Sequence, residues 1–164
     1  MTVLEDAEEI DRSNEWEKLR EAHLVAKELR PPSSANGIHH LALLCSDVEQ
    51  TITFYQDVLE FPLTELFENR DYKGSTHFFF DIGNGNALAF FDFPGLDLGP
   101  YQEVLGSMHH LAISVAPDTH LHLKSKLKAA GVNIVFEHEN SFYFNGPDGE
   151  PVSYTHLTLP TKDS

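Results

Sequence analysis

A repeated histidine-bearing segment constrains the fold of this chain more than any other feature of its sequence. Residues 38–43 read IHHLAL and residues 108–113 read MHHLAI, so the segment recurs after 70 residues. Each copy has the alternation of apolar and other side chains that is typical of a half-buried β-strand. A repeat of this kind indicates two modules of similar structure that bury a face against each other.

The residues after each copy of the strand predict a helix. Asp47 and Asp118 follow the two strands, and aspartate is a favourable helix N-cap. Apolar residues then recur at helical spacing over residues 48–59 in the first module and residues 121–130 in the second. The second helix is expected to stop at Gly131, because glycine suits the position after a helix C-terminus.

Aromatic strands and glycine turns follow each predicted helix. Residues 78–85 read FFFDIGNG and residues 142–149 read FYFNGPDG. The Asn84-Gly85 and Asp148-Gly149 pairs are strong hairpin signals. The repeated unit is therefore one strand, one helix and two or three further strands, with module one at about residues 37–95 and module two at about residues 106–156.

Residues 1–36 are expected to form a helical arm and a linker. The charged segment 4–30 carries one rough apolar stripe of Trp16, Leu19, Val25 and Leu29, and two prolines at positions 31 and 32 stop the helix. A packed or frayed terminal helix is the favoured interpretation. The alternative is an arm that covers a partner subunit or the mouth of a site.

The charge and cysteine content exclude several classes of function. Eleven Lys and Arg against 26 Asp and Glu give a net charge of −15, which repels nucleic acids and anionic membranes. The first residues are acidic, unlike a secretion signal, so a cytoplasmic location is expected. Cys45 is the one cysteine, so a disulfide framework and a cysteine-rich zinc site are excluded, and any metal ligands must be histidines and carboxylates.

Two histidines occupy equivalent places in the repeat. Side chains alternate along a strand, so Leu41 and Leu43 should face the helices while His40 faces the other way, as His110 does in the second copy. If the modules pair about a pseudo-twofold axis, the two imidazoles converge, and neutral imidazole is a common ligand for Fe, Zn, Ni and Mn ions. The alternative is that they are ordinary surface histidines.

The other histidines are given lesser roles. His39 and His109 are expected on the helix side of their strands, as structural residues. His77 begins a strand and is a candidate pocket residue without binding metal. Four further histidines belong to no cluster of candidate site residues and are expected to be exposed; they are His23, His120, His122 and His138.

At this point three segments together resemble the vicinal oxygen chelate superfamily, which includes glyoxalases, bleomycin resistance proteins and dioxygenases. These segments are residues 38–43, 54–61 and 141–149, and the resemblance covers about residues 38–152. It implies an α+β fold of two tandem βαβββ modules whose mixed sheet curls into an open cup around one metal ion, here with an extra N-terminal helix. It also implies a small-molecule substrate and a homodimer.

The resemblance implies a ligand set. Metal-binding members use a histidine of the first strand and one at the start of module two, which correspond to His40 and His110. Their glutamate, four residues after the Pro-Asp-Gly turn, corresponds to Ser153, so the carboxylate of a two-histidine, one-carboxylate site is absent. The further glutamate of glyoxalase I corresponds to Ala89, which argues against methylglyoxal chemistry. Fe²⁺ is the expected ion, with Mn²⁺, Zn²⁺ or Ni²⁺ as alternatives.

Tyr143 is the candidate catalytic residue. It corresponds to a substrate-contacting tyrosine of fosfomycin transferases, although those enzymes carry a threonine where this chain has Ala42. Its phenol would act as an acid or a hydrogen-bond donor, and the alternative is a core aromatic residue. The expected substrate pocket contains His77, Phe79 and Phe91, and further aromatics at positions 90 and 93 are expected to line the same cup.

The last residues depart from the family pattern. From about Val152 the sequence resembles translated sequencing-adaptor read-through, and residues 157–164 form a tail of artefactual character. We therefore expect the natural chain to carry glutamate where this sequence has Ser153.

Two functions remain open from the sequence. The first is a divalent-metal-dependent, dioxygenase-like enzyme acting on a small molecule, and the paired histidines favour it. The second is a metal-free protein that binds and sequesters a small molecule, as bleomycin resistance proteins do, and the missing glutamate favours it.

Overall fold

The computed structural model describes residues 10–156, and its contacts divide the chain into Met1–Gly37 and Ile38–Ser164. The first unit contains the helix α1 (Ser13–His23) and one 3₁₀ turn, η1 (Lys27–Leu29). The predicted helix to residue 30 is therefore too long, because the backbone becomes extended at Leu24. Its apolar stripe is exposed, so packing among residues 10–37 does not extend the helix. The predicted start of this helix lies outside the described residues.

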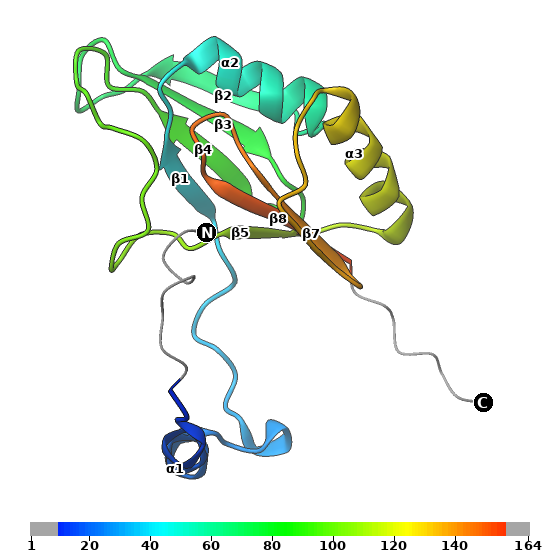
Figure 1. The fold of residues 1–164 in the computed structure, drawn as a ribbon. Coiled ribbons are helices and arrows are strands. Elements are labelled where there is room, and N and C mark those ends of the chain that lie inside the picture. The colour runs from blue at the N-terminus through cyan, green and yellow to red at the C-terminus, as the bar shows by residue number, and fades with distance from the viewer. Residues whose placement is uncertain (1–9, 157–164) are drawn as a thin grey trace. The chain divides into compact units, whose positions relative to one another are not determined.

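Module one has the order strand, helix and three strands (Figure 1). Its sheet has the order β1-β4-β3-β2, with β1 parallel to β4 and the other pairs antiparallel. The elements are β1 (His40–Leu44), α2 (Val48–Ile52), η2 (Thr53–Val58), β2 (Leu63–Glu68), β3 (Thr76–Asp81) and β4 (Ala87–Phe91).

Module two repeats this order and this strand pairing. Its sheet has the order β5-β8-β7-β6, again with one parallel pair at the β5 edge. The elements are β5 (Leu111–Ser114), α3 (Pro117–Ala129), β6 (Phe136–His138), β7 (Ser141–Asn145) and β8 (Pro151–Thr155). The predicted α+β fold of two βαβββ modules with an N-terminal helix is confirmed. In place of the expected mixed sheet curled into a cup, each module has its own four-stranded mixed sheet.

The helix ends follow local chemistry. Asp47 caps α2 as predicted, because its carboxylate accepts a hydrogen bond of 2.8 Å from the backbone N–H of Gln50. Asp118 is not a cap: α3 begins at Pro117, whose fixed φ suits the first helical position, so Asp118 lies in the first turn. Gly131 follows α3 with φ of +77°, as predicted for a helix C-terminus.

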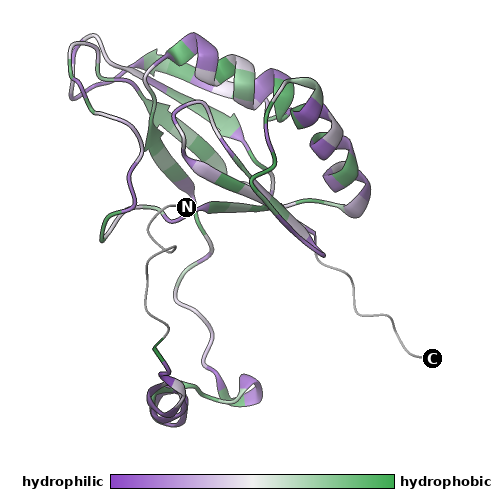
Figure 2. Cartoon of the chain, in the orientation of Figure 1, coloured by the Kyte–Doolittle hydropathy of each residue, from purple (hydrophilic) through white to green (hydrophobic). Residues whose placement is uncertain are grey.

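The core lies between the helices and one face of each sheet. Apolar residues dominate the strands, whereas α2 and α3 carry hydrophilic residues on part of their surface (Figure 2). Phe90 packs in this core with its ring centroid 4.9 Å from that of Tyr55, so the prediction that it lines the open cup is wrong. His120 is also buried, with its ring centroid 4.6 Å from that of Phe142, so the prediction that it is exposed is wrong. None of the described helices is long and apolar enough to cross a membrane.

Contacts between the modules make this core continuous. Phe54 of η2 contacts Phe144 of β7 at 6.3 Å between ring centroids, and Phe61 contacts Tyr154 at the same separation. Burial of these aromatic surfaces stabilises the two modules as one body.

Candidate functional site

The strand register places equivalent residues of the two modules in equivalent rows on the open faces of the sheets. Residues paired across neighbouring strands point to the same side of a sheet. The row in module one is Ala42, Ala89 and Phe79, and the row in module two is Ala112, Ser153 and Tyr143. Ala89 and Ser153 therefore hold equivalent positions in the two sheets, as the sequence repeat predicted.

The two predicted ligand histidines have matching surroundings. His40 packs edge-on against Phe79 with ring centroids 5.6 Å apart and an interplanar angle of 69°. His110 packs against Tyr143 at 5.5 Å and 65°. Each imidazole therefore lies against the equivalent aromatic ring of its own module, on the face that does not carry the helix.

The contacts of each imidazole stay within its own module. The strand β1 carries His40, and His110 immediately precedes β5; these strands are edges of two separate sheets. Within residues 10–156 no aromatic contact joins the two rings. No group of three His, Cys, Asp or Glu side chains in this range could hold a metal ion. The fold thus makes the two histidines equivalent without completing a ligand set around them.

Ser153 occupies the third position of the expected ligand set. It is fully buried, and its hydroxyl has no hydrogen-bond partner among the described residues. Its neighbours in the row are Ala112 and Tyr143. These residues fit a borderline divalent ion only in part. The imidazole nitrogens of His40 and His110 are suitable metal ligands, but the neutral hydroxyl of Ser153 supplies none of the charge that a carboxylate would bring.

An apolar wall lies beside His40. His77 stacks on Phe91 with ring centroids 3.7 Å apart, and lies 4.3 Å from Phe79. Burial lowers the pKa of His77, and the neighbouring His40 lowers it further. Its Nε2 is buried with no hydrogen-bond partner among the described residues. The structure therefore brings together the three residues that the sequence assigned to a substrate pocket.

His39 and His109 do not face the helices. Both are exposed, which contradicts their assignment to the helix side. His39 Nδ1 lies 2.8 Å from His40 Nδ1, and His109 Nδ1 lies 2.7 Å from His110 Nδ1. The sequence signal for this pairing was the doubling of histidine in both copies of the repeat.

A buried carboxylate joins the modules away from the histidines. Tyr55 of η2 donates a hydrogen bond of 2.7 Å to Glu150 Oε1, and Glu150 Oε2 accepts one of 3.0 Å from the backbone N–H of Asp148. Burial raises the pKa of Glu150 above its usual value despite these bonds, and burial and the Glu150 charge raise the pKa of Tyr55. No sequence pattern indicated this contact, because the two residues are 95 positions apart.

A cavity of about 970 Å³ lies between β1 and the segment that connects the modules. Its walls are mainly apolar, and its charged residues are all acidic; these are Asp92, Asp97, Asp148 and Glu150. Phe93, which was expected in the cup, lines this cavity instead, and none of the predicted ligand, catalytic or pocket residues does. The candidate site is therefore the open histidine face and not this cavity.

Comparison with known proteins identifies similar chains. The model of the Glyoxalase/Bleomycin resistance protein/Dioxygenase superfamily matches residues 37–154. MhqA of Bacillus subtilis, whose name assigns it to ring-cleaving dioxygenases, is 30% identical over 53% of this chain and 28% of its own length. The metallothiol transferase FosB of Bacillus licheniformis is 32% identical over 69% of this chain and 70% of its own length. The chain thus spans less than a third of the ring-cleaving relative.

A solved structure shares the fold. The fosfomycin resistance protein FosX of Listeria monocytogenes, solved in complex with Mn(II) and sulfate, superimposes with a TM-score of 0.58 at 21% identity. The match covers 76% of this chain and 95% of that protein. At this level of identity the comparison establishes the fold and not the reaction.

Proposed function

The chain belongs to the Glyoxalase/Bleomycin resistance protein/Dioxygenase superfamily, and from this premise we propose that it is a divalent-metal-dependent enzyme acting on a small molecule, of the dioxygenase-like kind. His40 and His110 are the proposed metal ligands. The observation that carries the proposal is the equivalence of these two imidazoles, which follow the same register and pack against the equivalent rings of Phe79 and Tyr143.

The side chains around the histidines have distinct proposed roles. When bound, a divalent ion would supply Lewis acidity toward the oxygen atoms of a substrate. The half-buried Tyr143 contacts the His110 ring, so its phenol can donate a hydrogen bond to a substrate oxygen nearby. Phe79, Phe91 and His77 form an apolar wall that suits a flat aromatic substrate and keeps water from that side.

Fe²⁺ is the proposed ion, with Mn²⁺, Zn²⁺ and Ni²⁺ as alternatives. Two imidazoles with one carboxylate is the ligand set of non-haem Fe²⁺ oxygenases, and the related FosX structure contains Mn(II). The proposed site has one carboxylate position, at residue 153, whereas the glyoxalase type has a second one, which corresponds to Ala89.

We also propose that the protein is a homodimer. Both strands at the candidate site are edge strands, β1 in one sheet and β5 in the other. Unpaired strand edges favour association with another strand. An edge-to-edge association of two copies would place His40 of one copy near the second module of the other, where a ligand set could form. Sedimentation equilibrium would test this, and a monomer at micromolar concentration would contradict it.

The second candidate function is metal-free binding of a small molecule. The observation that favours it is Ser153, a neutral buried residue where the metal-binding pattern has glutamate. The same apolar wall beside His40 would then bind the ligand without any reaction.

Metal analysis separates the two functions. Protein purified without added metal should contain Fe, Mn, Zn or Ni in a fixed ratio to the chain, and His40→Ala and His110→Ala should each abolish it. His122→Ala is the matched control, because His122 is an exposed histidine that pairs with Glu60 on the opposite side of the fold. Metal-free protein that keeps a small-molecule ligand would support the second function instead.

The variant Ser153→Glu tests the ligand set directly. It adds the missing charge in the row of Ala112 and Tyr143, so the affinity for Mn²⁺ should rise at least about tenfold, equal to about 1.4 kcal/mol. The control is Ala89→Glu at the equivalent place in module one, where the dioxygenase-like set needs no carboxylate. Equal affinity in the parent and Ser153→Glu would count against the proposal, as would a larger gain in Ala89→Glu. Resequencing the source DNA would show whether codon 153 encodes glutamate.

A further inference from the structure

The cavity beside β1 has the size and the lining of a small-molecule binding site. Its volume of about 970 Å³ lies at the upper end of the range of about 300–1,000 Å³ that is typical of ligand pockets. Its apolar side chains come from β1, from the connecting segment 93–101 and from Met108. Walls of this kind bind the apolar body of a ligand by removing it from water.

The charged side chains of this cavity all carry the same sign. Asp92, Asp97, Asp148 and Glu150 line it, and no Lys, Arg or His of residues 10–156 does. Asp97 is exposed, and Asp92 and Asp148 are half-buried. Glu150 is only 7% exposed. The negative charge therefore extends from the solvent into the interior wall of the cavity.

None of these four carboxylates forms an ion pair with another described residue. Asp148 accepts a hydrogen bond of 3.0 Å from the backbone N–H of Ser46. Glu150 accepts from the Tyr55 hydroxyl and from a backbone N–H. Because a carboxylate has about four acceptor positions, these neutral donors leave some free and compensate no charge. Burial raises the pKa of Glu150, as expected for a carboxylate that lacks a neighbouring cation.

The pKa of Cys45 shows that the charges act inside the cavity. Cys45 is buried in the cavity wall, and its pKa is raised to about 12. Burial is the main cause, and the charges of Asp148 and Asp92 raise the pKa further. A negative field that disfavours a thiolate favours a positive group at the same place.

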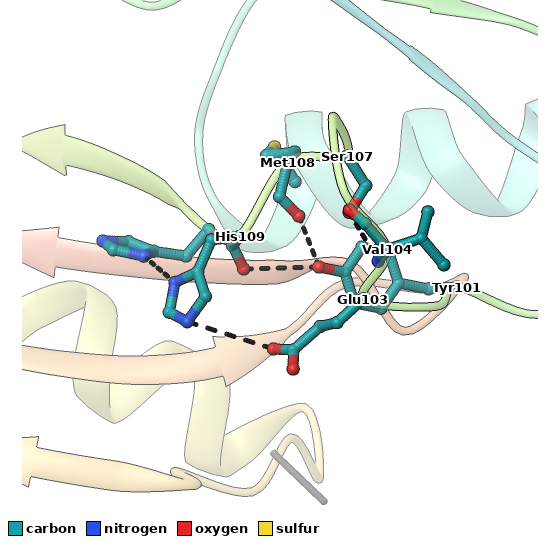
Figure 3. A network of polar contacts seen from close by, with 7 residues as sticks. Tyr101, Glu103, Val104, Ser107, Met108 and His109 are labelled. Carbon is teal, nitrogen blue, oxygen red and sulfur yellow. Dashed lines mark hydrogen bonds and ion pairs between the residues drawn. The ribbon is translucent and has the colours of Figure 1, made fainter. Parts of the chain in front are cut away.

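Hydrogen bonds hold one wall of the cavity in place. The hydroxyl of Tyr101 donates to the backbone oxygen of Met108 and lies 3.4 Å from that of His109 (Figure 3). The Oγ of Ser107 accepts a hydrogen bond of 3.1 Å from the backbone N–H of Val104 (Figure 3). Because Tyr101, Ser107 and Met108 all line the cavity, this wall is formed before a ligand binds, which lowers the entropic cost of binding.

We propose that the cavity binds an organic cation, whose ammonium group lies against Asp148 and Glu150 and whose apolar body lies against β1 and the connecting segment. An ammonium that carries hydrogen suits these carboxylates, because they accept charge-assisted hydrogen bonds. The inference is independent of the proposed metal-dependent function, because His40 and His110 do not line the cavity.

Tryptamine, tryptophol and indoleacetate test the sign of the charge. They share an indole ring and end in an ammonium, a hydroxyl and a carboxylate, respectively. Isothermal titration calorimetry of the full chain, with a chelator present to exclude metal, measures each affinity. We expect one tryptamine to bind per chain, tryptophol to bind at least about tenfold more weakly and indoleacetate not to bind. The inference is overturned if tryptamine does not bind, or if tryptophol binds equally well.

Neutral variants of the same shape test the two carboxylates. Asp148→Asn and Glu150→Gln each remove one charge and keep an oxygen that accepts the existing hydrogen bonds. Each should weaken tryptamine binding about tenfold or more and leave tryptophol binding unchanged. Asp81→Asn is the matched control, because Asp81 is an exposed aspartate outside the cavity that accepts a bond of 2.7 Å from the backbone N–H of Gly83. An equal loss in Asp81→Asn would mean that net charge alone attracts the amine, and would refute the site.

The variant Leu98→Trp tests the location. Leu98 lines the cavity and is 50% exposed, so a larger side chain can fill the space without disturbing the core. Tryptamine and tryptophol should both bind at least about tenfold more weakly. Leu121→Trp is the control, because Leu121 is an exposed residue of α3 outside the cavity. Thermal unfolding checks that each variant is folded, and unchanged tryptamine binding in folded Leu98→Trp would contradict the proposed site.

Discussion

Replacement of Tyr55 by phenylalanine should destabilise the protein by removing one hydrogen bond. Tyr55 is fully buried, and its hydroxyl donates to Glu150, a carboxylate that is only 7% exposed. A hydrogen bond to a charged group contributes about 1.5–3 kcal/mol, and phenylalanine keeps the ring that packs between the modules. We therefore expect the free energy of unfolding to fall by about 2 kcal/mol at neutral pH. For a chain of this length that corresponds to a fall in Tm of about 4–8 °C.

The loss should depend on pH in a defined direction. The pKa of Glu150 is raised in the folded protein. Protonation of Glu150 therefore stabilises the folded state at pH values below the ordinary pKa of glutamate, and this contribution is lost as pH rises through the raised pKa. Without the Tyr55 hydroxyl the folded pKa rises further, since a donor to the ionised carboxylate is gone. The destabilisation by Tyr55→Phe should consequently be largest at neutral pH and smaller near pH 4.

Urea unfolding followed by circular dichroism at both pH values measures this effect. Tyr72→Phe is the matched control, because Tyr72 is a partly exposed tyrosine whose hydroxyl has no hydrogen bond among the described residues. The reasoning is refuted if Tyr55→Phe unfolds at the same urea concentration as the parent at neutral pH, or if its loss is equal at the two pH values.

Three further predictions concern the same body of the molecule. Gly146→Ala should lower the free energy of unfolding, measured in urea, by about 1–3 kcal/mol, because a Cβ there would clash with Glu150 Oε1 and displace the carboxyl; parent-like stability would contradict this geometry. Cys45 should resist a thiol reagent at pH 8 until the protein unfolds, since burial raises its pKa to about 12; labelling of the native protein within seconds would disprove it. Lys126→Met should cost at most about 1 kcal/mol at pH 7, because its partner Glu60 is half-exposed. That small loss should vanish in melts at acidic pH, since Lys126 lowers the pKa of Glu60 and the contribution is lost as pH falls through that value.

Local patterns predicted most of the elements. The alternation after residue 38 and after residue 108, the Asp47 cap and the glycine after α3 act within a few residues, so the sequence alone contained the two modules. The β4 strand shows where this fails. Its residues ALAFF carry no polar side chain, so alternation could not tell that Phe90 faces the core while Phe91 faces the open side. Pairing with β1 and β3 decides that, and those strands are distant in sequence.

The candidate site divides along the same line. The repeat and strand parity were enough to single out His40 and His110 and to align Ser153 with Ala89, because the side-chain period of a strand is fixed by its backbone. The neighbours of these residues were not predictable. His39 and His109 turn toward the adjacent ring because they lie where the ladder begins, and Glu103 reaches His109 through a segment without periodicity.

By itself, the sequence determined two strand–helix–strand modules and one histidine at the same position in each, since hydrophobic period, caps and turns are short-range properties. Only the tertiary structure decided which ring each histidine packs against and how the modules are joined, through Tyr55 and Glu150 and the aromatic contacts around them. The physical reason is that these contacts link residues far apart in the chain, and their energies depend on burial and on a match of surfaces that no local pattern encodes.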